Sequence, residues 1–173
     1  MDLQYPVGRF EWPAAVSPED RRRYIDEIEQ TPKNMRVAVT GLSDQQLDTP
    51  YRPQGWTVRQ VVHHLPDSHL NSYLRFRLAL TEDEPTIKPY DEARWAELVD
   101  ARTAPVELSL TLLDSLHKRW VLLLRSLSAA DCSRKFLHPE IGEVTLEKNL
   151  ALYAWHGRHH VAHITSLRQR LGW

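Results

Sequence analysis

Four of the nine histidines lie within eight consecutive positions, from His156 to His163, inside an apolar segment near the C-terminus. Imidazoles that are buried together cost free energy unless each has a partner, and a divalent metal ion is the partner that makes such a group favourable. A solvated loop does not need this clustering. The segment therefore requires a fold that buries histidines side by side, and it points to a metal site.

The spacing of these histidines fits one helix. At about 100° per residue, His156 and His160 lie one turn apart on the apolar stripe that would face a core. His159 and His163 form a second pair with the same spacing, displaced to the flank of that stripe. We therefore expect His156 and His160 to be ligands. The flanking pair suits hydrogen bonding to a ligand, and surface placement of His163 is an equal alternative.

Composition excludes several classes of protein. A chain of 173 residues with a net charge of −1 fits one soluble domain and gives no sign of nucleic-acid or anionic-membrane binding. The longest apolar run, 120–124, is too short to cross a bilayer, and the first residues do not resemble a signal peptide. The single cysteine, Cys132, excludes an internal disulfide and favours a cytoplasmic location. We interpret Cys132 as incidental.

Four long amphipathic segments dominate the pattern, and strand signals are few. We expect an all-α four-helix bundle in an up-down arrangement, as a single domain over residues 1–173, with a long excursion between the second and third helices. The expected elements are an extended arm over 1–16, helices over 17–40, 57–80, 105–127 and 146–171, a short helix within 91–99, and a short extended piece over 140–145. Pro32 is expected to interrupt or kink the first helix.

A third ligand must come from another helix, and the second helix offers three histidines. His69 lies on the main apolar line of that helix, His64 lies on its flank and His63 points away. Spacing alone weighs His64 and His69 equally. Pro66 complicates the choice, because a proline inside a helix removes one backbone hydrogen bond and can swing the preceding turn.

Two further residues have weaker signals. Asp67 lies about one turn after His64 and could orient a ligand or act as a base, and a solvated acid is an equal alternative. His117, in the third helix, stands beside Lys118 and Arg119. We therefore expect His117 at the surface or at an interface.

Several strings in the sequence resemble the YfiT group of the DinB-like superfamily. The resemblance covers nearly the whole chain, and the run of motifs is specific. The strings are Gly55-Trp56-Thr57-Val58-Arg59-Gln60-Val61-Val62-His63-His64-Leu65, then Asp67-Ser68-His69-Leu70-Asn71-Ser72-Tyr73, and Tyr153-Ala154-Trp155-His156 with His159-His160-Val161-Ala162-His163-Ile164. In one departure, Pro66 stands where family members commonly have alanine.

This resemblance implies a four-helix bundle with one divalent metal held by three histidines. The family motif in the second helix falls on His64, and its C-terminal pair falls on His156 and His160. The family is described as metal-dependent hydrolases, with relatives that are thiol-dependent S-transferases. The resemblance therefore favours a hydrolase. The alternatives are a small-thiol S-transferase of the bacillithiol-transferase kind and a non-catalytic metal-binding bundle.

Three neutral imidazoles leave a divalent metal with its full charge and at least one open position, which is typical of catalytic sites. Such a metal lowers the pKa of water towards about 7, and the same charge favours a thiolate. Zn²⁺ is the first expectation, with Ni²⁺ or Fe²⁺ as alternatives. The expected partner is a small-molecule substrate, with a low-molecular-weight thiol as one candidate. No nucleic-acid or membrane partner is expected, and a homodimer is left open.

Overall fold

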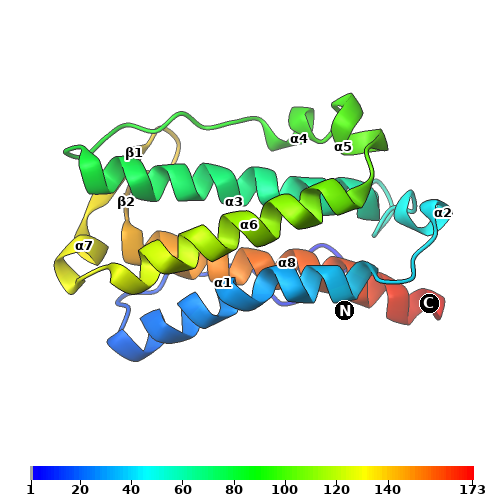
Figure 1. The fold of residues 1–173 in the computed structure, drawn as a ribbon, viewed down its shortest axis with the longest axis horizontal. Helices are drawn as coiled ribbons and strands as arrows, with labels where there is room; N and C mark the ends of the chain where they lie inside the picture. Colours follow the sequence, from blue (N-terminus) through cyan, green and yellow to red (C-terminus); the bar gives the residue numbers. More distant parts are fainter. Residues whose placement is uncertain (1) are drawn as a thin grey trace.

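The computed structural model describes residues 2–173 and shows a bundle of four long helices (Figure 1). These helices are α1 (Pro18–Val39), α3 (Val58–Thr81), α6 (Val106–Ser126) and α8 (Leu146–Leu171). The four-helix bundle expected from the sequence is confirmed, with bounds close to the expected ones. Residues 2–16 form no helix or strand, as expected for the N-terminal arm.

The order of the helices around the bundle corrects the expected up-down arrangement. Helix α1 packs against α6 and α8, and α3 packs against the same two helices, so α1 and α3 lie diagonally opposite. Helices α1 and α8 run in one direction, and α3 and α6 run in the other (Figure 1). The long excursion is the cause, because it returns the chain to the starting end of α3 before α6 begins.

Local sequence signals set the helix ends. The side chains of Ser17 and Thr57 cap α1 and α3 by accepting hydrogen bonds from backbone N–H groups. Helix α8 ends at Gly172, whose φ of 69° is the left-handed conformation that glycine adopts at little cost. Pro32 and Pro66 lie inside α1 and α3, and both helices continue through them. The interruption expected at Pro32 is therefore wrong, and α3 carries its histidines on one continuous helix.

Short elements close the two ends of the bundle. They are α2 (Asp44–Leu47), α4 (Glu92–Trp95), α5 (Val99–Thr103), α7 (Ala129–Ser133) and an antiparallel hairpin of β1 (Lys135–His138) and β2 (Gly142–Thr145). Two α3 side chains hold the excursion in place. Gln60 donates to the carbonyl of Ala96 (2.7 Å), and the buried Arg59 guanidinium donates to the carbonyl of Ala104 (3.1 Å).

The core consists of two apolar clusters separated by histidines. One cluster is centred on Ile28, Phe76, Trp120 and Leu150, and the other on Met35, Val61, Leu113 and Ile164. His69 on α3, and His156 and His160 on α8, lie in sequence between the residues that enter the two clusters, and His64 precedes Leu65 at the edge of the second cluster. The bundle therefore buries a layer of imidazoles across its middle.

His117 corrects one expectation. It is only 2% exposed, whereas we expected it at the surface or at an interface. The charges on Lys118 and Arg119 are poor guides, because successive residues on a helix point about 100° apart. Leu108 and Leu112 on the same helix are exposed at 64% and 46%, although both are apolar. The buried face of α6 instead passes through Leu110, Leu113, His117, Trp120 and Leu124.

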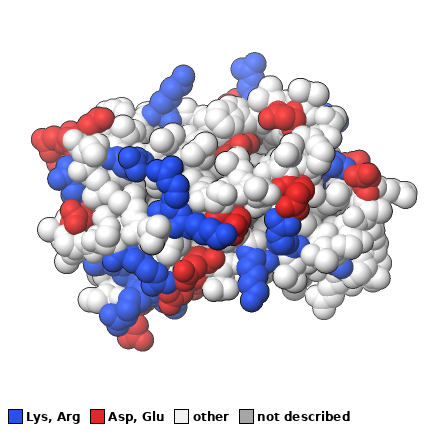
Figure 2. Space-filling model, in the orientation of Figure 1, with Lys and Arg blue, Asp and Glu red and all other residues white. Residues whose placement is uncertain are grey.

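The surface carries both signs of charge. Figure 2, in the orientation of Figure 1, shows basic and acidic side chains interspersed over the visible face of the bundle. Exposed ion pairs such as Arg36–Glu107 and Arg125–Asp26 join neighbouring helices on this surface. Across residues 2–173, none of the helices has the length and apolar character that crossing a membrane requires.

Candidate metal centre

Three imidazoles meet where α3 faces α8. The Nε2 atoms of His64 and His156 are 3.4 Å apart, and those of His160 and His156 are 3.1 Å apart. The possible ligand atoms of all three residues lie within 4.8 Å of one another. The structure therefore brings together the three residues that the sequence and the family resemblance selected, which we call the His triad.

The donor set of the His triad fits a divalent metal. Two ligands that lie about 2.0–2.1 Å from a tetrahedral zinc ion are about 3.4 Å apart, which is close to the measured nitrogen separations. Three nitrogens with no carboxylate among them are typical of zinc, nickel or iron, and not of magnesium or calcium. The role of the triad as metal ligands stays a prediction, now with a matching geometry.

Burial keeps the triad neutral. It lowers the pKa of His64 to about 3 and the pKa values of His156 and His160 well below the ordinary value, and the neighbouring imidazoles lower them further. A histidine binds a metal through the lone pair of its neutral form. Each triad member is therefore neutral at pH 7, and no imidazolium has to lose its charge before a metal can bind.

The triad lines a cavity of about 1060 Å³. Aromatic side chains form much of its wall, and Trp56 lies directly against His64, with ring centroids 4.7 Å apart. Arg75 and His138 are its basic residues on the side of the hairpin. The cavity is large enough for a small organic molecule, since ligand pockets are typically about 300–1,000 Å³.

The N-terminal arm forms part of this cavity. The Nε2 of His163 donates to the carbonyl of Gln4 (3.0 Å), and the indole of Trp155 donates to the carbonyl of Gly8 (3.1 Å). His163 stacks on Tyr51, with ring centroids 3.9 Å apart. The position of the arm could not be predicted from sequence, because no periodic pattern connects residues 2–16 to α8.

His159, His160 and His163 form a second group whose possible ligand atoms lie within 4.8 Å of one another. His160 belongs to both groups. Since the carbonyl of Gln4 holds a proton on the Nε2 of His163, a neutral His163 has its lone pair on Nδ1. His163 is 3% exposed and lies beside His160 of the triad, rather than at the surface, and burial lowers its pKa.

His69 contacts one member of the triad, His156. Its Nε2 lies 3.1 Å from the Nδ1 of His156, and its Nδ1 lies 2.8 Å from the Nε2 of His117. The Nδ1 of His117 in turn lies 2.6 Å from the carbonyl oxygen of Ile28. His69 is thus buried against a ligand candidate and is not in the triad. His63 points away from the triad, as expected, and binds Ser109 and the carbonyl of Ala104.

Asp67 lies apart from the triad. It lines a separate hollow of about 200 Å³ with His63, Asp100 and Ser109. Burial and the nearby Asp100 raise the pKa of its carboxyl to about 6. Among residues 2–173 this carboxylate makes no hydrogen bond to a triad histidine. Its role as an orienting residue or a base stays a prediction, without a supporting contact.

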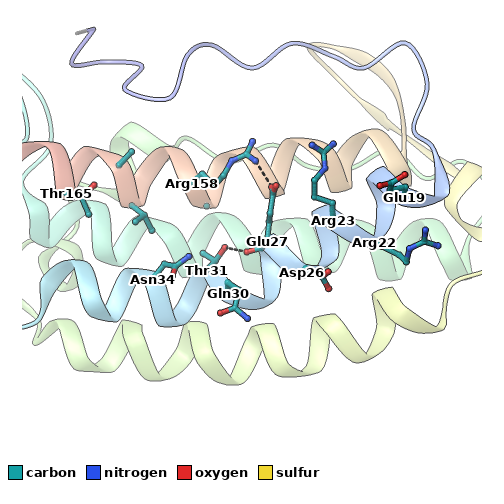
Figure 3. A pocket seen from close by; sticks show the side chains of 13 residues that line it. Glu19, Arg22, Arg23, Asp26, Glu27, Gln30, Thr31, Asn34, Arg158 and Thr165 are labelled. Carbon is teal, nitrogen blue, oxygen red and sulfur yellow. Dashed lines mark hydrogen bonds and ion pairs between the residues drawn. The ribbon is translucent and has the colours of Figure 1, made fainter.

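A second large hollow, of about 700 Å³, follows the seam between α1 and α8 (Figure 3). The Arg158–Glu27 ion pair (2.7 Å) spans this seam, and Thr31 donates to the carbonyl of Glu27. Other charged side chains, Glu19, Arg22, Arg23 and Asp26, also line this hollow, and none of its lining residues is a histidine or a cysteine. Gly157, which lies between two triad histidines in the sequence, packs against Thr31 at the same place. At this contact α1 and α8 approach each other closely.

Comparison with known proteins gives consistent matches. The sequence profile of the DinB superfamily matches residues 27–164. Proteins of Bacillus mycoides (strain KBAB4) and Bacillus cereus (strain B4264), both named as candidate metal-dependent hydrolases, are each 58% identical over 172 residues, or 99% of either chain.

Two solved structures are also similar. YfiT from Bacillus subtilis, described as a candidate metal-dependent hydrolase with an unusual four-helix bundle topology, has a TM-score of 0.97 and 50% identity. This match covers 100% of this chain and 99% of YfiT. The four-helix bundle protein TT2238 has a TM-score of 0.56 and 20% identity over 82% of this chain and 94% of its own, which supports the fold alone.

Proposed function

Because the chain belongs to the DinB superfamily, we propose that it is a metal-dependent hydrolase of a small substrate. His64, His156 and His160 would hold one divalent ion, with Zn²⁺ as the first choice and Ni²⁺ or Fe²⁺ as alternatives. One observation carries the proposal. Three neutral imidazoles converge within 4.8 Å on the wall of a cavity that can hold a substrate.

A divalent ion held by three neutral ligands supplies a Lewis acid and lowers the pKa of a coordinated water molecule or thiol. The protein contributes the surroundings of this chemistry. Trp56 packs against His64 and Tyr153 packs against His156, so aromatic side chains form the cavity wall beside the triad. His163 is a candidate proton acceptor through its Nδ1, since its Nε2 is already occupied by the carbonyl of Gln4.

Arg75 is the candidate anchor for the substrate. It lines the cavity, and among residues 2–173 it makes no ion pair. A guanidinium binds carboxylate or phosphate groups in a forked geometry. The proposed substrate is therefore a small molecule with an anionic group at the hairpin end of the cavity and its reactive bond beside the triad.

A small-thiol S-transferase is the second candidate, and the size of the cavity favours it. Hydrolysis needs one organic substrate and water, whereas S-transfer needs a thiol and an electrophile at the same time. A cavity of about 1060 Å³ has room for both. The same charge that lowers the pKa of water would also favour a thiolate. A low-molecular-weight thiol is therefore the proposed co-substrate in this alternative.

A paired assay separates these functions. Zinc-loaded and chelated protein are compared in two arms, one with activated esters and amides in water, and one with an electrophilic haloarene and a panel of small thiols. We expect metal-dependent hydrolysis in the first arm. Conjugation without hydrolysis would replace our first choice with the S-transferase. No turnover in either arm, with one metal bound per chain, would favour a non-catalytic metal-binding bundle.

A further inference from the structure

A row of hydrogen bonds leads from the His triad through the core to helix α1. It runs from His156 on α8 to His69 on α3, then to His117 on α6, and ends at the carbonyl oxygen of Ile28 on α1. The three separations are 3.1, 2.8 and 2.6 Å in that order. We call these four groups the histidine row. It joins all four helices of the bundle through a single line of contacts.

The last member of the row determines the direction of every hydrogen bond in it. A carbonyl oxygen only accepts, so the Nδ1 of His117 must carry the proton. His69 and His117 are 0% and 2% exposed, and within residues 2–173 their ring nitrogens form hydrogen bonds only with imidazoles and this carbonyl. Among residues 2–173 no carboxylate bonds to either ring, and the nearby Asp114 is paired with Lys118. Burial therefore keeps both rings neutral.

A neutral imidazole has one N–H and one lone pair. With its proton on Nδ1, His117 accepts at Nε2 from the Nδ1–H of His69. His69 then has its lone pair on Nε2 and accepts from the Nδ1–H of His156. His156 is left with an unprotonated Nε2, which is the atom that faces His64 and His160.

We propose that His69 and His117 are positioning residues that fix the tautomer of His156, so that its Nε2 lone pair always faces the centre of the His triad. The inference rests on the proposed metal site and deepens it. In the opposite tautomer the N–H of His156 would point to the place where the ion must bind. The carbonyl of Ile28, three hydrogen bonds away, thus prepares one ligand before any metal arrives.

The other two triad members are not held in this way. The Nδ1 of His160 is buried and has no hydrogen-bond partner among residues 2–173. In the metal-free protein His160 can therefore donate from Nε2 to the lone pair of His156, 3.1 Å away. His156 is the fixed ligand of the triad, and His160 is the ligand whose proton must move when a metal binds.

The first test uses the unaltered protein without metal. Nitrogen-15 NMR of histidine-labelled protein distinguishes a protonated ring nitrogen from a bare one. We expect His156, His69 and His117 each to be protonated at Nδ1 and bare at Nε2. A proton on the Nε2 of His156 would overturn the inference. Because no metal is present, this result does not depend on the proposed function.

The second test uses two substitutions at the far end of the row. His117→Phe removes the acceptor for His69 and lets the row reverse. His117→Gln restores both roles, because its amide nitrogen can donate to the carbonyl of Ile28 and its oxygen can accept from His69. His63→Phe, at a buried histidine that binds Ser109 on the side of α3 away from the triad, is the matched control.

Zinc affinity is measured by competition with a chromophoric chelator, together with the His156 tautomer. We expect His117→Phe to weaken zinc binding about 10–100-fold, the usual loss for a group that orients a metal ligand, and to give mixed tautomers. His117→Gln should recover most of the affinity, and His63→Phe should match the unaltered protein. Folded His117→Phe protein with unchanged affinity and tautomer would refute the role of the row. If the predicted tautomers hold but no metal binds, the proposed function fails and the row stands.

Discussion

Gly157 packs against Thr31 where α8 approaches α1, and a β-carbon on Gly157 would lie 2.5 Å from the Oγ1 of Thr31. That separation is far below van der Waals contact. Gly157 immediately follows His156 and comes three residues before His160, so the close approach of the two helices also sets the position of two triad members. Glycine is needed here for space, and not for an unusual backbone conformation.

Substituting Gly157→Ala should overpack this seam. We expect the free energy of unfolding to fall by about 1–3 kcal/mol, which is typical when a methyl group is forced into a packed interior. Zinc affinity should fall as well, because α8 must shift. Urea unfolding and a zinc titration of the same variant measure the two effects.

The control is the double variant Thr31→Ala with Gly157→Ala. Removing the Oγ1 and Cγ2 of Thr31 takes away the two closest contacts and leaves its Cβ at 3.3 Å. The double variant should therefore be more stable than Gly157→Ala alone, a coupling that a double-mutant cycle measures directly. Additive losses would mean that Thr31 is not what excludes the methyl group.

Each of the triad substitutions His64→Ala, His156→Ala and His160→Ala should weaken zinc binding by more than about 100-fold, above the range expected for a supporting group. His138→Ala is the matched control, because His138 lines the same cavity but does not belong to the triad. Isothermal titration of metal-free protein gives the affinities. Unimpaired binding in any triad variant would remove that residue from the ligand set.

The histidine row should also make stability depend on pH. Burial lowers the pKa of His117 to about 4, below the 6.5 of an exposed histidine. Between these values the unfolded chain binds a proton that the folded chain does not, so stability falls as the pH falls from about 6.5 to 4. The shift corresponds to about 3 kcal/mol.

Metal-free His117→Gln, which cannot titrate, should lose stability less steeply over this interval. Chemical denaturation at several pH values gives the slope for each protein. Equal slopes for the variant and the unaltered protein would show that His117 does not contribute to the acid sensitivity of the fold.

Much of the fold could be predicted from sequence because the helix signals are local. Capping residues, proline positions and apolar periodicity gave the four long helices within a few residues. The arrangement of those helices could not be predicted in the same way. Whether the excursion after α3 ends near its start or its finish depends on contacts such as Gln60 with Ala96, which link residues far apart in the sequence.

The residues of the candidate site could likewise be predicted only in part. His156 and His160 are one turn apart on one helix, so spacing alone brings them together. The choice between His64 and His69 depends on how α3 is rotated against α8, and spacing left it open. His117 was missed because its partners, His69 and the carbonyl of Ile28, lie on two other helices. The one available signal was that His117 is three residues before Trp120 and so shares the apolar face of α6.

The N-terminal arm should support the cavity without taking part in metal binding. Deleting residues 1–9 removes two hydrogen bonds, from His163 to Gln4 and from Trp155 to Gly8. At about 0.5–1.5 kcal/mol for each bond, we expect the free energy of unfolding to fall by about 1–3 kcal/mol. Zinc affinity should stay within a few-fold, because all three triad residues lie on α3 and α8.

The KM of any substrate that is turned over should rise in the truncated protein, since Gln4 and Tyr5 line the cavity. Tyr5→Ala tests the contribution of a single cavity side chain in the intact chain. A truncated protein that folds but no longer binds zinc would show instead that the arm holds the triad together.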